Sequence, residues 1–138
     1  MGTNYYLQRE RDKCHHCGRS DAPLHIGKSS AGWHFGLHID PENNINSLDD
    51  WIKLWSIPYT TIINEYDKVI TPEEMLDTIT NRSWPREGGP HPYVSWDEFH
   101  VKNHSEPGLN GLAAHKGYGE FKAIRTDGTY DLMTGYFR

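Results

Sequence analysis

Both cysteines of the chain lie in one histidine-rich stretch, residues 14–39, whose spacing could hold a metal ion. Cys14 and Cys17 are separated by two residues and followed by Gly18, which is the pattern of a zinc knuckle. In such a knuckle a tight turn directs both thiolates at one ion, and glycine tolerates the backbone angles of the turn. A closed tetrahedral site needs two further ligands, so the pattern predicts a structural zinc ion.

The two further ligands are expected among the histidines of LHIGKSSAGWHFGLHI, residues 24–39, which alternates like a β-hairpin. With the bend between Ser29 and Ser30, His25 lies opposite His34 on one face, with Cβ atoms ~5 Å apart. The finger-like pair His34 and His38 is disfavoured, because residues four apart on a strand lie roughly 13 Å apart. His38 remains the substitute ligand if the register differs. The predicted zinc ligands are Cys14, Cys17, His25 and His34.

Two other interpretations of the same stretch remain open. The histidines could be the polar face of a half-exposed strand beside free thiols. The cysteines could instead be a redox pair, but this would need a helix N-terminus that GRSDAPLH does not supply. In a reducing compartment, the C-x-x-C spacing favours metal binding over a structural disulfide.

The tripeptide Gly27-Lys28-Ser29 matches the end of a phosphate-binding loop, but its surroundings do not. Ala22 stands where the loop needs its first glycine, and Pro23 removes a backbone N–H that the phosphate cradle would use. The segment is expected to form an exposed hairpin tip instead. The residues predicted to contact a small anionic ligand or a partner protein there are Lys28, Ser29 and Ser30.

A second histidine cluster lies in WDEFHVKNHSEPGLNGLAAHKG, residues 96–117, and could be catalytic. His100, His104 and His115 are the residues of an alternative function, a metal-dependent hydrolase that echoes the HNH nucleases. The spacing is short for that family, and Gly111 and Gly117 interrupt the helix that would carry the last histidine. The leading prediction therefore assigns no catalytic residue, and leans away from an enzyme.

Two helices and several short strands are expected to position these residues. Ser47 and Thr71 are predicted to cap helices in SLDDWIKLW and TPEEMLDTITNR, both with an apolar stripe at helical spacing. The strand candidates are NYYLQRE, TTIINEYDKVI with a turn at residues 65–68, and a C-terminal hairpin around Asp127-Gly128. Residues 83–119 look loop-rich, because the proline and glycine of SWPREGGPHPY prevent regular structure.

The predicted fold class is α+β: a small single domain of short antiparallel hairpins and two short helices, stabilised by the zinc knuckle. Within 1–138 the expected parts are 14–39 (knuckle plus hairpin), 47–82 (two helices with a β element between), 83–119 (loop-rich) and 120–138 (C-terminal hairpin). Only 36% of the residues are hydrophobic, so aromatic side chains must fill much of the core.

Charge and hydropathy limit the partners. The formal net charge of −5 disfavours nucleic acid, and no apolar run approaches the ~20 residues of a membrane-spanning helix. The first residues, MGTNYYLQRERDKC, lack the apolar core of a signal peptide, so a cytoplasmic location is expected.

Five segments together resemble a group of small uncharacterised proteins encoded in tailed-bacteriophage genomes. These segments are CxxCGR, LHIGKSSAGWHFGLHI, SLDDWIKLW, EPGLNGLAAHKG and GTYDLMTGYFR. The resemblance covers most of the chain, with HIGKSSAGW as its specific part, and it supplies no activity or catalytic residues. It implies a protein made in the cytoplasm of a host bacterium. Such a protein is expected to bind a host protein or a small anionic ligand, as an inhibitor or a sequestering agent.

Overall fold

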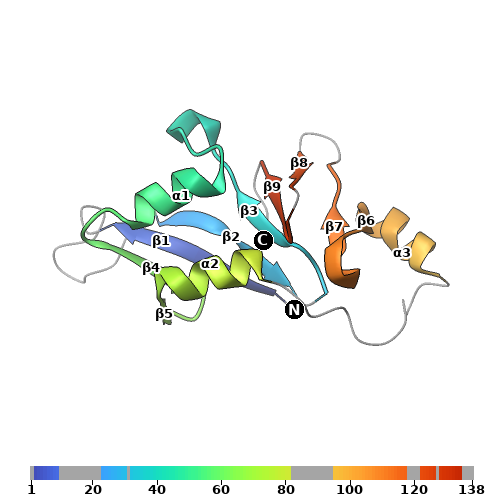
Figure 1. The fold of residues 1–138 in the computed structure, drawn as a ribbon, viewed down its shortest axis with the longest axis horizontal. Helices are drawn as coiled ribbons and strands as arrows, with labels where there is room; N and C mark the ends of the chain where they lie inside the picture. Colours follow the sequence, from blue (N-terminus) through green and yellow to red (C-terminus); the bar gives the residue numbers. More distant parts are fainter. Residues whose placement is uncertain are drawn as a thin grey trace.

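The computed structural model describes residues 2–9, 23–30, 32–81, 95–117, 122–126 and 128–134. The described residues are mixed α+β, with three α-helices, a seven-stranded sheet and a separate two-stranded sheet (Figure 1). The large sheet has the strand order β5-β4-β1-β2-β3-β9-β8. Its strands are β1 (Gly2–Arg9), β2 (Leu24–Ser30), β3 (Phe35–His38), β4 (Thr60–Asn64), β5 (Val69–Ile70), β8 (Ala123–Arg125) and β9 (Tyr130–Met133). The small sheet pairs β6 (Ser105–Pro107) with β7 (Ala113–His115).

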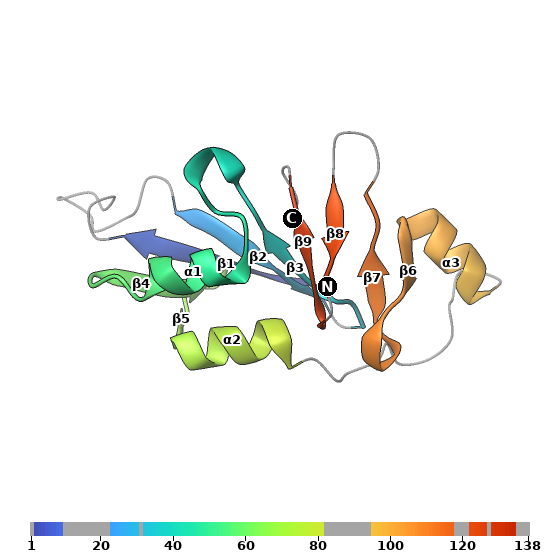
Figure 2. The ribbon, with the colours of Figure 1, turned by 45° about the horizontal axis from the view of Figure 1, so that its top comes forward.

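The two predicted helices are confirmed as α1 (Leu48–Trp55) and α2 (Pro72–Thr80). The Ser47 and Thr71 side chains accept the capping hydrogen bonds. Both helices lie against the same face of the large sheet (Figure 2). Their buried side chains pack on apolar residues of β1 to β5. The main core consists of Leu7, Ile26, Phe35, Leu37, Ile45, Trp51, Trp55, Ile62, Ile70, Met75 and Ile79.

A third helix, α3 (Trp96–Asn103), lies inside the region predicted to be loop-rich. The Ser95 hydroxyl accepts the Glu98 N–H at 3.2 Å, and His104 ends the helix in a left-handed conformation with φ 51°. The S-x-x-E spacing of Ser95 and Glu98 is a helix-start signal that could have identified this helix. Only Phe99 is buried among its residues, so its apolar stripe is weak.

The pairing of β2 with β3 differs from the predicted hairpin. Gly27 pairs with Leu37, whereas a bend between Ser29 and Ser30 would have paired it with Gly32. The chain reverses later, where the Trp33 N–H donates to the Ser30 oxygen at 3.1 Å. The shift is an odd number of residues, so it exchanges the faces of the two strands relative to each other. The predicted pairing of His25 with His34 is therefore wrong.

The segment Lys28-Ser29-Ser30 is not an exposed tip. It is the second half of β2, half-buried, and Lys28 pairs with Asn4 on one side and Gly36 on the other. The residue before this segment, Gly27, has no room for a side chain. A Cβ there would lie 2.1 Å from the Gly36 oxygen and 2.5 Å from the Phe35 ring. The glycine therefore reflects packing between strands, which explains its presence without a phosphate loop.

The remaining predicted strands are present, but they join one sheet. β4 and β5 pair antiparallel around a turn, with the Asp67 N–H donating to the Asn64 oxygen at 3.0 Å. The C-terminal hairpin is confirmed as the antiparallel pair β8–β9. β9 also pairs in parallel with β3, which no local pattern in the sequence predicted. The helix α3 and the β6–β7 pair lie at the end of the molecule beyond β8 (Figures 1 and 2).

Candidate functional site

The structure brings His25 and His38 together on the neighbouring strands β2 and β3, with ring centroids 5.5 Å apart. His25 Nε2 lies 2.9 Å from Asn4 Oδ1, and His38 Nδ1 lies 3.1 Å from the backbone oxygen of His25. Both contacts place a ring nitrogen opposite an oxygen that can only accept, so each ring donates an N–H there. Each ring is therefore oriented by an oxygen acceptor on one of its nitrogens.

The pair lies at the end of the sheet where the connection between β1 and β2 begins and ends. In the antiparallel register Tyr6 pairs with His25, and β1 ends at Arg9, only a few residues later. Residues 10–22 join the two strands and contain Cys14 and Cys17. Both cysteines lie outside the described residues.

His34, the other predicted zinc ligand, lies apart from this pair and is fully buried. Its Nδ1 is 3.3 Å from Asp131 Oδ1, and its Nε2 accepts the backbone N–H of Leu109 at 3.1 Å. Both ring nitrogens are therefore engaged by the protein. A metal could bind His34 only if one of these hydrogen bonds were broken.

His34 lies where the strand pairing divides. Its backbone N–H donates to the Ala113 oxygen of β7 at 2.8 Å, whereas the Phe35 N–H donates to the Thr129 oxygen before β9 at 3.1 Å. Trp33 forms a parallel bridge with Ala113, while Phe35 pairs with Tyr130. The segment leading into β3 thus changes its pairing partner from β7 to β9 within two residues. We call this point the strand fork.

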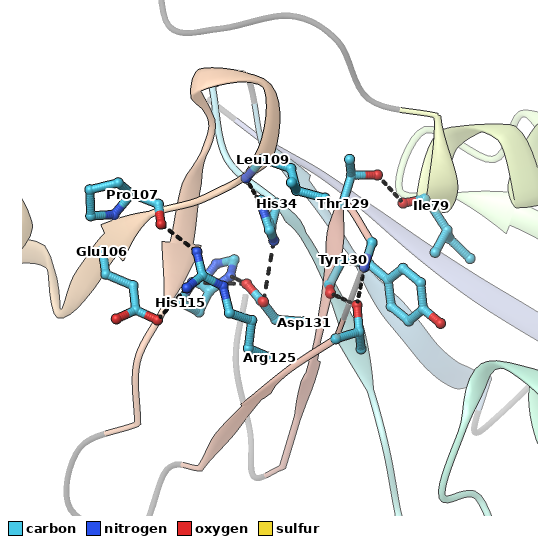
Figure 3. Close-up of polar contacts among 12 residues, drawn as sticks. His34, Ile79, Glu106, Pro107, Leu109, His115, Arg125, Thr129, Tyr130 and Asp131 are labelled. Atoms are coloured by element: carbon cyan, nitrogen blue, oxygen red, sulfur yellow. Dashed lines mark hydrogen bonds and ion pairs between the residues drawn. The ribbon is translucent and has the colours of Figure 1, made fainter.

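Asp131 lies in the strand fork and is completely buried. Its Oδ2 accepts the backbone N–H of His115 at 2.8 Å and faces His115 Nδ1 at 2.8 Å (Figure 3). Its Oδ1 faces His34 Nδ1. One carboxylate therefore connects β9, the start of β3 and β7.

The hydrogen bonds determine the tautomers of both histidines. The Leu109 N–H can only donate, so His34 Nε2 is the acceptor and Nδ1 carries the proton that Asp131 accepts. His115 Nδ1 likewise donates to Asp131, which leaves the lone pair of neutral His115 on Nε2. In the part of the chain that the structure describes, no hydrogen bond reaches this Nε2.

The carboxyl group of Asp131 is ionised in the folded protein. Burial by itself would raise its pKa, but hydrogen bonds from the His115 ring, the His34 ring and the His115 backbone lower the pKa to about 2. An ionised carboxylate that orients a histidine through Nδ1 is the arrangement that prepares a histidine for proton transfer at Nε2.

A cation stands on the strand next to this carboxylate. Arg125 is the register partner of Asp131 on β8, so the two side chains leave the same face of the sheet. Its Nη1 is 3.0 Å from Glu106 Oε1, and its Nη2 donates to the Pro107 oxygen. The Arg125 side chain is 42% exposed, and Figure 3 shows it grouped with His115 and Asp131.

The three histidines of the alternative hydrolase are not gathered into a metal site. His100 Nδ1 is 2.9 Å from Ser105 Oγ, His104 caps α3, and His115 bonds to Asp131. Among the described residues, no group of three or more His, Cys, Asp or Glu could hold a metal ion. An open cavity of about 540 Å³ lies between α3 and the small sheet. It is lined by Asp97, His100, Val101, His104, Ser105, Glu106, Pro107, Lys116 and Gly117.

Asp131 and Arg125 were not among the residues predicted from the sequence. Along β9, Asp131 and Met133 are buried and alternate with half-buried residues, so a charged residue occupies a position in phase with the core. A charge at a core position is a recognisable signal, because buried carboxylates are kept only where partners satisfy them. The partners themselves are His115 of β7, 16 residues from Asp131, and His34, which precedes β3 and lies 97 residues away.

No protein-family model matches the chain, and comparisons with curated proteins and with solved structures find no significant match. In the described residues, no helix has the length and apolar character needed to cross a membrane.

Proposed function

We propose that this chain is a phage-encoded zinc-binding protein that acts by binding a host protein or a small anionic ligand. The single observation that carries the metal site is the pair of His25 and His38 rings, 5.5 Å apart. The proposed ligands replace His34 of the sequence-based set with His38. They are Cys14, Cys17, His25 and His38.

The hydrogen bonds of the two rings support this assignment. A histidine that binds a metal usually donates its other ring N–H to a carboxylate or carbonyl oxygen, which fixes the ring and its tautomer. His25 has Asn4 Oδ1 in that position, and His38 has the His25 backbone oxygen. In this arrangement a metal would be bound through the second ring nitrogen of each histidine, His25 Nδ1 and His38 Nε2.

The position of the cysteines in the sequence supplies the other half of the site. Cys14 and Cys17 belong to the connection between Arg9 and Pro23, and His25 follows Pro23 by two residues. A zinc ion with two thiolates and two imidazoles has a full tetrahedral shell. Such an ion stabilises the fold and leaves no position for substrate, so the protein would act through its surface.

Metal analysis by native mass spectrometry tests the proposal. We expect one zinc ion per chain in the wild-type protein, and loss of zinc in His38→Ala and in Cys14→Ala. His34→Asn is the matched control, because it removes the histidine of the original set from the strand fork and should keep the metal. Zinc retained by His38→Ala, or a wild-type protein without zinc, would contradict the site.

The same measurement tests the alternative function, a metal-dependent hydrolase. That alternative requires a second metal ion, lost together with nuclease activity in His100→Ala. A protein that contains one zinc ion, unaffected by His100→Ala, argues for the binding role.

A further inference from the structure

We propose that His115 is the general base of a second site, which hydrolyses small phosphate esters, and that Arg125 binds the phosphoryl group. The zinc site does not take part, so either proposal can fail without the other. Asp131 and His34 act as positioning residues that do not reach the substrate. Asp131 is hydrogen-bonded to His115 directly, and His34 acts on His115 through Asp131.

The base is prepared by the strand fork. Asp131 accepts both the ring N–H and the backbone N–H of His115, each at 2.8 Å, so neither the ring nor its tautomer can change freely. Trp33 covers one side of the ring, with centroids 5.0 Å apart. The His115 side chain is still 23% exposed, which gives water and a small ligand access to it. A histidine held in this way accepts a proton at Nε2.

His34 holds the carboxylate in turn. Its ring is locked between the Leu109 N–H and Asp131 Oδ1, and it is completely buried. A Cβ at Gly108 would lie 2.3 Å from His34 Nε2, so the chain passes closely over this ring. With Oδ1 bonded to this ring, Oδ2 of Asp131 faces His115.

Arg125 supplies the charge that a phosphoryl group needs. A guanidinium has five N–H donors, and its two contacts with Glu106 and Pro107 leave others for a phosphate oxygen. Glu106 and Pro107 also line the cavity of about 540 Å³, together with Lys116, the neighbour of His115 in the sequence. The guanidinium therefore contacts two residues that line this cavity, to which Lys116 adds a further cation.

The substrate class follows from these groups. A histidine base near a cation suits a reaction in which water attacks an anionic centre, as in phosphate-ester hydrolysis. The net charge of −5 disfavours a long polyanion, so the substrate is a small ester and not a nucleic acid chain. A small anion is also one of the two partner classes of the proposed binding function.

The proposed step is balanced without any further reactant. His115 Nε2 takes a proton from water while the water oxygen bonds to phosphorus. The bond from phosphorus to the alcohol oxygen breaks, and His115 returns a proton to that oxygen. A phosphodiester and water thus give a phosphomonoester and an alcohol.

Release of nitrophenolate from bis(4-nitrophenyl) phosphate tests the base. The wild-type, zinc-containing protein should release it above the buffer rate, and His115→Gln should reduce kcat at least ~100-fold. Lys122→Gln, which removes an exposed cation beside β8, is the matched control and should leave kcat and KM unchanged. Circular dichroism confirms that each variant is folded. No release by the wild-type protein, or equal release by His115→Gln, overturns the proposal.

Three further variants separate binding from proton transfer. Arg125→Gln should raise KM severalfold, whereas Glu106→Gln should lower KM, because it removes the carboxylate that competes for the guanidinium. Asp131→Asn should shift the His115 proton from Nδ1 to Nε2, detected by nitrogen NMR of the ring, and reduce kcat as His115→Gln does. An unchanged KM in both charge variants, or an unchanged tautomer in Asp131→Asn, contradicts the assigned roles.

Discussion

Asp131 places a negative charge where the alternation of β9 calls for an apolar side chain. Its burial is tolerated because three N–H groups reach its two oxygens, from the His115 backbone, the His115 ring and the His34 ring. No other type of side chain of this size could satisfy all three. An asparagine would turn its amide N–H₂ toward one of these donors in either orientation.

The first prediction concerns pH. The folded-state pKa of Asp131, about 2, lies below its ordinary value of 3.8, so its stabilisation is present above pH ~4 and is lost as the pH falls toward 2. The loss should be about 2 kcal/mol of the free energy of unfolding. Urea unfolding of the wild-type protein between pH 6 and pH 2 measures it. Asp131→Asn should be less stable at pH 6 by roughly 1–3 kcal/mol and should lack this part of the pH dependence. Parallel pH curves for the two proteins would contradict the role of the carboxylate.

For the secondary-structure elements, the sequence predicted local structure better than it predicted which strands pair. The helices α1 and α2 could be predicted because each begins with a capping side chain and carries an apolar stripe, all within one short segment. The helix α3 has the cap, at Ser95, but only one buried residue. The strands β1, β4 and β5 were recognisable from their composition, but the composition of a strand does not determine which other strand it pairs with.

The candidate sites likewise depend on strand pairing that the sequence did not predict. The sequence indicated which histidines could matter, yet the choice between His34 and His38 depended on a register that shifts with the position of one turn. The fork at Asp131 joins residues from both halves of the chain, and only the pairing of β9 with β3 brings them together. Conversely, the sequence placed His115 in the cluster of an alternative metal-dependent hydrolase, whereas in the structure its ring is hydrogen-bonded to Asp131.

The second prediction tests the packing of β2 against β3. In Gly27→Ala the new Cβ would meet the Gly36 oxygen at 2.1 Å, and this backbone atom cannot move without separating the strands. We expect a loss of roughly 1–3 kcal/mol in the free energy of unfolding. Gly128→Ala is the control, because its Cβ would make only an ordinary contact of 3.4 Å with the Tyr130 ring. Equal stability of the two variants in urea unfolding would show that the strands are less closely packed.

At the scale of the whole molecule, the described residues form two packing groups. The main core lies between the sheet and the helices α1 and α2. A second group consists of α3, β6 and β7, where Phe99 packs against Trp33 with ring centroids 5.9 Å apart. The two groups meet at the strand fork, where polar contacts of Asp131 join β9 to His34 and to β7.

The third prediction follows from this arrangement. His34→Ala removes the partner of Asp131 Oδ1 and of the Leu109 N–H, so the second group should open more often while the main core stays closed. Hydrogen exchange of the Ala113 and His115 amides should accelerate at least ~10-fold, and that of the β1 amides should not change. His104→Asn, at an exposed position where asparagine tolerates the left-handed backbone, is the control. Uniform acceleration across both groups would show that the molecule opens as one unit.

The parallel pairing of β3 with β9 also has a consequence for folding. Its residues are far apart in the sequence, as the separation of 97 between His34 and Asp131 shows, so closing this contact carries a large entropic cost. We expect the β1-β2-β3-β4 part of the sheet to form first, with its local turns and helices, and β9 to dock late. Until then β3 presents an open edge whose backbone groups can pair with another chain. The hazard of aggregation during refolding should therefore be concentrated at β3 and fall once β9 is in place.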